Sequence, residues 1–191
     1  MTPAEIDPIV RRAQQGDAEA MAALYRTYAP PIYRYMVYRV ASPADAEDLT
    51  AEVFLKMVEG LPAYRFTGAP FAAWLYRIAA ARVIDYHRRA ARRPQVALSD
   101  SLANGKPAPE EQVQQWGEVQ ALSDALQQLP DEHQTILILR FIEGKSHKEV
   151  ADLLGKSVTA VKTAQYRALT RLAGLLGSAE KARHYLRGGD G

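Results

Sequence analysis

Apolar residues recur every three to four positions along almost the whole chain, which is the pattern of amphipathic α-helices. Strand-like alternation bounded by turns does not occur. The first periodic segment runs from about residue 8 to residue 40 and contains Pro30-Pro31. Because proline has no amide hydrogen and clashes with the preceding helical turn, these prolines predict either two helices or one broken helix.

Two further helices are predicted in the first half. Ser42 is a good N-cap and Pro43 suits a first helical turn, so a helix should begin there and end near Gly60 and Pro62. Its predicted buried stripe consists of Leu49, Val53, Phe54, Met57 and Val58. After a loop, the next helix should cover about residues 70–93, with Phe71, Trp74, Leu75 and Ile78 on its apolar face.

Composition then changes at residues 94–111, which are rich in Pro, Gly, Ser and Asp and read as a polar linker. Helical periodicity returns at about residues 113–128, and again from Pro130 to Gly144. We therefore predict an all-α fold of two small helical domains joined by a flexible linker, the second containing a helix-turn-helix. The expected domains are residues 1–93 and 112–178, with 94–111 as linker and 179–191 as tail.

The helix-turn-helix is predicted from its caps. Ser146 and Glu149 form a capping box, Gly155 ends the short helix, and Ser157 caps the last one. The last helix should bury Val161, Ala164, Ala168, Leu172 and Leu175. Such a second helix is slim enough to enter the DNA major groove, where Lys162 can hold phosphates and Thr159, Thr163, and Gln165 or Tyr166 can approach base edges. The alternative is a plain helical hairpin within a bundle.

Charge is segregated along the chain although the net charge is only +2. Residues 44–59 carry −4, residues 61–93 carry +6, residues 94–132 carry −6 and residues 156–176 carry +4. Basic helices that also carry aromatic, Ser and Thr side chains suit phosphate and base contacts, whereas the alternative is a solvated helix face.

Other functional classes lack support in the sequence. There is no cysteine, the four histidines are scattered, and neither a P-loop nor a nucleophile elbow occurs, so we expect no enzyme activity, no catalytic residue, no metal and no cofactor. The N-terminus has no apolar signal-peptide core, and no apolar run approaches the length of a membrane span. We therefore expect a cytoplasmic protein without membrane insertion.

Several blocks, taken in their order and spacing, resemble bacterial sigma factors of the extracytoplasmic-function (ECF) group of the sigma-70 family. DAEDLTAEVF at residues 45–54 resembles region 2.2, and FAAWLYRIA at residues 71–79 with the following arginine run resembles regions 2.3 and 2.4. Five short blocks in the second half resemble region 4: LP, LRF, EGKS, EVA and LGKS, which begin at residues 129, 139, 143, 149 and 154. The likeness spans roughly residues 9–176.

This resemblance implies a transcription initiation factor that binds core RNA polymerase at its clamp and flap, promoter DNA, and an anti-sigma factor. It assigns −35 contacts to Lys156, Ser157, Thr159, Lys162, Thr163, Tyr166, Arg167 and Arg171. It assigns −10 capture and melting to Tyr64, Arg65, Phe66, Thr67, Arg77, Arg82, Arg88 and Arg89. It assigns polymerase binding to Asp45, Asp48, Ala51, Glu52 and Leu55.

The chain also departs from the family pattern. Ala80-Ala81 stands where the family often has Arg-Asn, and Thr159-Ala160 stands where Gly-Thr is common. A competing hypothesis is a stand-alone helix-turn-helix regulator that binds duplex DNA without polymerase. That hypothesis accounts for the second half of the chain, but not for the paired acidic and basic helices of the first.

Overall fold

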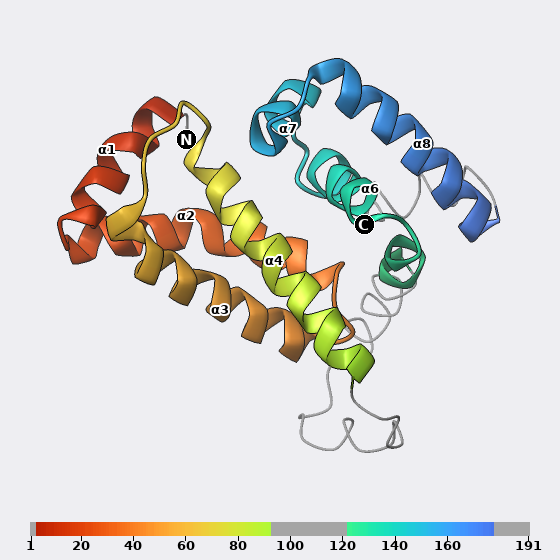
Figure 1. Cartoon of the computed structure of the whole chain (residues 1–191), viewed down its shortest axis with the longest axis horizontal. Helices are drawn as coiled ribbons and strands as arrows, with labels where there is room; N and C mark the ends of the chain where they lie inside the picture. The colour runs from red at the N-terminus through yellow and green to blue at the C-terminus, as the bar shows by residue number, and fades with distance from the viewer. Residues whose placement is uncertain (1–2, 93–121, 178–191) are drawn as a thin grey trace, which may run out of the picture.

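The structure, a computed structural model, describes residues 3–92 and 122–177, and within these ranges every regular element is helical (Figure 1). The all-α fold predicted from the sequence is therefore confirmed. None of the helices in these ranges is long and apolar enough to cross a membrane. The predicted linker, most of the helix expected at 113–128, and the tail from residue 178 lie outside the described residues.

The N-terminal half is a helical bundle. Its elements are α1 (Pro3–Gln14), α2 (Ala18–Val37), α3 (Pro43–Gly60), the short 3₁₀ helix η1 (Leu61–Ala63) and α4 (Phe71–Arg92). The C-terminal half comprises a helical stretch at residues 122–127, α6 (Asp131–Leu137), the π-helical turn η2 (Ile138–Ile142), α7 (His147–Leu154) and α8 (Val158–Leu176).

The break predicted at Pro30-Pro31 is wrong, because α2 runs through both prolines. The chain breaks instead before α2, where Gly16 adopts a left-handed φ of 86°. Asp17 then caps α2 by accepting hydrogen bonds from the amides of Glu19 (2.9 Å) and Ala20 (3.1 Å). Burial of the apolar residues after the prolines keeps α2 helical; these are Ile32, Tyr35, Met36 and Val37.

The core of the N-terminal half lies where α2, α3 and α4 pack together. Leu49, Val53 and Met57 are buried there as predicted, and Ser42 caps α3. Val58 was predicted to join this stripe, but it is 46% exposed. It lies one position beyond Met57, so the helical twist carries its side chain off the buried face.

In the C-terminal half, α8 packs against both α6 and α7. The predicted caps at Ser146, Gly155 and Ser157 are confirmed. Leu175 is 40% exposed, which corrects the predicted stripe; in the last turn of α8 the neighbouring Leu176 packs against the core instead. The π turn η2 was not predicted; in it the amide of Glu143 donates to the Ile138 carbonyl at 3.0 Å.

The two halves are joined by polar contacts between α2 and the region around α6. Arg34 forms a two-pronged ion pair with Glu143, at 2.8 and 2.9 Å. Arg39, only 1% exposed, donates to Asp131 at 2.7 Å and to Tyr35 and Thr135 at 3.1 Å. These contacts bring α4 against α7.

Candidate nucleic-acid and polymerase interfaces

The helix-turn-helix is built by its capping residues. The Ser146 amide donates to the Glu149 carboxylate at 2.8 Å, and the Glu149 amide donates to the Ser146 hydroxyl at 3.2 Å. Hydrogen bonding of the Glu149 carboxylate to the side chain and the backbone amide of Ser146 holds the pKa of this carboxyl below its usual value. Gly155 turns the chain with a left-handed φ of 64°, and Ser157 then caps α8 through the Ala160 amide at 3.1 Å. The turn thereby fixes the direction of α8.

The outer face of α8 gathers most of the residues predicted for −35 contact. Lys162, Arg167 and Arg171 are exposed, and Tyr166 is 73% exposed. Beside them an open groove is lined by Thr159, Thr163 and Arg167, with Pro130 and His133 also on its walls. Lys156 differs from these cations in having an acidic partner, because its ammonium pairs with Glu132 at 3.1 Å.

Gln165 does not belong to this outer face. Its side-chain oxygen accepts a hydrogen bond from the Arg140 guanidinium at 3.0 Å, and Arg140 also donates to the Lys145 carbonyl. The half-buried His147 lies near this group, and burial together with Arg140 lowers the pKa of its imidazole. Of the two residues that the sequence left open, Tyr166 is the one that lies on the exposed face of α8.

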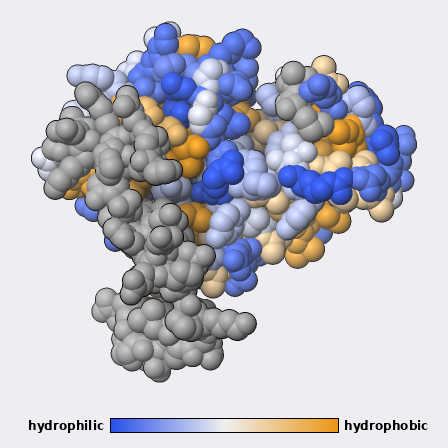
Figure 2. Space-filling view, turned by 180° about the vertical axis from the view of Figure 1, so that it is seen from behind, coloured by the Kyte–Doolittle hydropathy of each residue, from blue (hydrophilic) through white to orange (hydrophobic). Residues whose placement is uncertain are grey.

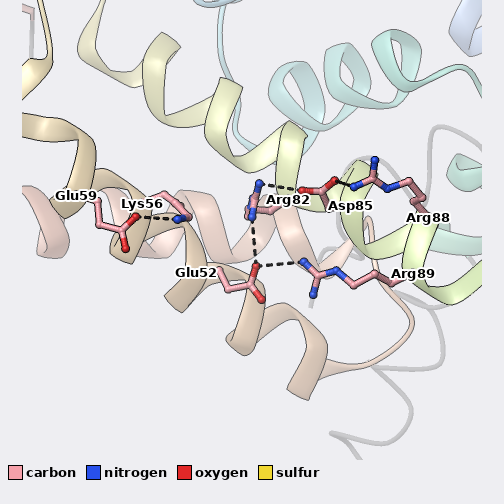
Figure 3. A network of polar contacts seen from close by, with 7 residues as sticks. All are labelled: Glu52, Lys56, Glu59, Arg82, Asp85, Arg88 and Arg89. Atoms are coloured by element: carbon pink, nitrogen blue, oxygen red, sulfur yellow. Dashed lines mark hydrogen bonds and ion pairs between the residues drawn. The ribbon is translucent and has the colours of Figure 1, made fainter.

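Ion pairs between α3 and α4, and within α4, hold three of the cations predicted for −10 contact (Figure 3). Glu52 on α3 lies 3.9 Å from Arg82 and 3.8 Å from Arg89 of α4. Asp85 pairs with Arg82 and Arg88, both at 2.8 Å. The basic surface of α4 is thus partly neutralised by acids of the same domain.

The loop between η1 and α4 contains an aromatic cluster. The Tyr64 ring lies 4.9 Å from the Trp74 ring, 5.2 Å from Phe71 and 5.3 Å from Phe66. Burial raises the pKa of the Tyr64 hydroxyl above its usual value. Tyr64 and Phe66 are half-buried, whereas Arg65 and Thr67 are exposed. Of the four residues predicted for base capture, two therefore anchor the loop and two face solvent.

Three of the five residues predicted to bind polymerase are exposed on α3. Asp48, Ala51 and Leu55 are exposed, Leu55 by 57%. Glu52 turns towards α4, as described above. Asp45 is half-buried, and its carboxylate accepts from the hydroxyls of Ser42 (2.7 Å) and Tyr86 (3.1 Å).

Sequence reasoning missed two exposed apolar residues on this side of the molecule, Val58 of α3 and Tyr25 of α2. Tyr25 is 53% exposed and packs edge-on against Phe54, with ring centres 4.8 Å apart. The signal for Val58 was its i,i+3 spacing from Leu55, which places both on one helix face. Figure 2 shows hydrophobic patches among hydrophilic side chains on the part of the back face where α2 and α3 lie.

A cavity of about 410 Å³ lies between the two halves. It is lined by α4, the preceding loop and Arg39 on one side, and by α6, α7 and the following turn on the other; the lining includes Thr67, Arg77, Ala80, Ile84, Leu154 and Lys156. Two predicted DNA-binding cations, Arg77 and Lys156, thus border the cavity. Within the described ranges, no group of three or more acidic or histidine side chains is arranged to hold a metal ion.

Comparisons with known proteins give one family match in each helical half of the chain. The sigma-70 region 2 family model matches residues 24–93, and the sigma-70 region 4 model matches residues 119–172. The ECF RNA polymerase sigma factor BldN of Streptomyces coelicolor is 40% identical over 170 residues, covering 88% of this chain and 64% of BldN. The ECF RNA polymerase sigma factor SigD of Mycobacterium tuberculosis is 37% identical over 174 residues, covering 87% of this chain and 82% of SigD.

Among solved structures, CnrH in complex with the cytosolic domain of CnrY is similar in fold, with a TM-score of 0.65 and 24% identity over 88% of this chain and 95% of that one. The two family regions match in the order and at the positions of the two helical halves. The chain therefore belongs to the ECF RNA polymerase sigma factors of the sigma-70 family.

Proposed function

We propose that this chain binds core RNA polymerase and directs it to specific promoters. In this proposal residues 1–93 engage polymerase and open the −10 element, residues 112–178 read the −35 element, and residues 94–111 link the two. One observation carries it: a helix-turn-helix with a cationic outer face is joined, in one chain, to a bundle whose α3 displays acidic and apolar side chains.

The α8 face supports promoter contact. Lysine and arginine side chains free of acidic neighbours neutralise phosphates, which provides most of the affinity for duplex DNA. Thr159, Thr163 and Tyr166 extend from the same face and have the hydroxyl groups that can bond to base edges or phosphates.

The α3 face supports polymerase contact. Asp48 supplies negative charge and Leu55 supplies an exposed apolar side chain, with Val58 one turn away. Such a surface suits a basic partner element, because charge steers the encounter while burial of the apolar side chains stabilises the complex.

We further propose that an anti-sigma factor holds this chain in the cytoplasm until it is needed. Two proteins of similar fold support this part: CnrH with the cytosolic domain of CnrY, and RpoE from Bartonella quintana with the anti-sigma factor NepR. A protein that acts with RNA polymerase works where the polymerase is, which supports the cytoplasmic location.

The test compares two charge reversals for affinity to purified bacterial core polymerase. Asp48→Arg should weaken binding about tenfold, because it places a cation against the proposed basic partner. The matched control is Glu19→Arg, an exposed acid of α2 whose reversal should change the affinity less than about twofold. Equal affinities for both variants and the unaltered chain would contradict the assignment of α3.

A further inference from the structure

One face of α1 lies against the loop that follows α3. In Figure 1 this loop rises beside α1 before the chain enters α4. Arg11 and Gln14 of α1 both contact the loop, and their i,i+3 spacing places them on the same side of the helix. The region 2 family match begins only at residue 24, so α1 lies outside it.

The Gln14 side chain clamps the beginning of the loop. Its amide nitrogen donates to the Leu61 carbonyl at 3.1 Å and to the Tyr64 carbonyl at 2.8 Å. These carbonyls lie at the first residue of η1 and just after its last, and the Tyr64 amide also donates to the Leu61 carbonyl at 3.0 Å. A primary amide has two N–H groups on one nitrogen, so Gln14 satisfies both carbonyls together.

Arg11 holds the next part of the loop. Its guanidinium carbon lies 4.2 Å from the centre of the Phe66 ring, a cation–π arrangement. Phe66 in turn packs edge-on against Tyr64, which Gln14 holds through its backbone. The contacts from α1 therefore fall on the two loop residues that anchor the aromatic cluster.

This anchoring decides which side chains the loop displays. Tyr64 has an extended backbone conformation, and from residue 64 to residue 67 half-buried and exposed side chains alternate. With Tyr64 and Phe66 held inward, Arg65 and Thr67 face solvent. Without the Gln14 hydrogen bonds the loop can adopt many backbone conformations. The direction in which Arg65 and Thr67 point is then no longer fixed.

We propose that Gln14, assisted by Arg11, is a positioning residue for the −10 element, which makes α1 part of the promoter-melting surface. The inference rests on the proposed function, which assigns the loop to base capture. Gln14 itself need not touch DNA; it acts by fixing where Arg65 and Thr67 meet the flipped base.

The decisive variant is Gln14→Glu, which keeps the size of the side chain but replaces its donor group by an oxygen that repels both carbonyls. Gln15→Glu is the matched control, since Gln15 is exposed and its side chain forms no hydrogen bond within the described residues. The first measurement is tryptic cleavage after Arg65 in the free full-length chain, quantified by mass spectrometry. Gln14→Glu should accelerate this cleavage about tenfold and Gln15→Glu less than twofold, because cleavage follows the population of released loop.

The second measurement is promoter opening by holoenzyme, followed by permanganate reactivity of −10 thymines on a promoter mapped by run-off transcription. Gln14→Glu should lower opening about tenfold and reduce discrimination between the native and a substituted −10 element, with core affinity unchanged. Arg11→Met, which removes no buried donor, should lower opening about threefold.

Unchanged cleavage and opening in Gln14→Glu would overturn the proposal. So would a loss of core affinity or of helix content equal to the loss of opening, because Gln14 would then support the whole domain rather than the loop. If the unaltered chain starts no transcription, the proposed function fails, and the cleavage measurement still decides whether α1 fixes the loop.

Discussion

The two basic surfaces of the chain hold their cations differently. On α8, Lys162, Arg167 and Arg171 form no ion pair within the described residues. On α4, each of Arg82, Arg88 and Arg89 pairs with Glu52 or Asp85. In the proposed function, the α8 cations can therefore meet phosphates directly, whereas the α4 cations must first exchange their ion pairs with Glu52 and Asp85 for contacts with DNA.

The difference follows from where the acids lie. Glu52 sits on α3, the helix proposed to face polymerase, and reaches across to α4 (Figure 3). No carboxylate in the part of α8 that the structure describes can do the same, because residues 158–176 contain neither Asp nor Glu. The Glu52–Arg89 pair at 3.8 Å is long and screened by salt, so Arg89, which has no other acidic partner within the described residues, can still be recruited.

The largest expected effect is on transcription, from a charge reversal on the α8 surface, whose cations form no ion pair within the described residues. Arg167→Glu should reduce promoter-directed transcription about thirtyfold, since it removes a phosphate contact and adds repulsion. Core affinity should remain unchanged, because α8 lies in the other half from α3. The control is Arg26→Glu, an exposed cation of α2 with the same charge change. Similar losses in both variants would show that α8 has no special role in DNA contact.

A smaller effect is expected on the DNA affinity of the α4 surface, whose cations form ion pairs. Glu52→Gln should strengthen binding of the free chain to single-stranded DNA about threefold at low salt, because Arg89 loses its counter-charge and Arg82 keeps only that of Asp85. Fluorescence anisotropy with a labelled oligonucleotide measures the affinity. Glu59→Gln is the control, since Glu59 pairs with Lys56 inside α3 rather than with α4. Equal gains from the two variants would contradict the idea that Glu52 masks the α4 cations.

The smallest effect concerns the outer face of α3. Val58→Ala should change the free energy of unfolding by less than about 0.5 kcal/mol, because Val58 is 46% exposed. Val53→Ala is the reference; Val53 is fully buried, and its truncation should cost about 1–3 kcal/mol by thermal or denaturant unfolding. A cost for Val58→Ala as large as that for Val53→Ala would restore the buried stripe predicted from the sequence.

Helix caps and periodicity were the dependable part of the sequence interpretation. Ser42, Ser146, Gly155 and Ser157 act locally, so their spacing alone predicted the helix ends that the structure shows. Pro30-Pro31 misled the prediction, because burial of Ile32, Tyr35 and Met36 outweighs the lost hydrogen bonds of the prolines.

Hydrophobic periodicity could not predict contacts between segments that lie far apart in the sequence. The pairing of Glu52 with Arg82 and Arg89, and of Arg39 with Asp131, depends on how helices pack. A helical pattern places a side chain on a face, but does not say which neighbour covers that face. The same limit hid the contact of Gln14 with the loop, which joins residues 47 and 50 positions apart.

Run-off transcription tests the central claim most directly. Purified core polymerase is incubated with genomic fragments, with and without the chain, and the start sites are mapped. The account predicts discrete starts that appear only when the chain is present and that Arg167→Glu weakens about thirtyfold, with weak binding of the chain alone to the same duplex. Tight specific binding to duplex without polymerase, and no starts that depend on the chain, would contradict the account.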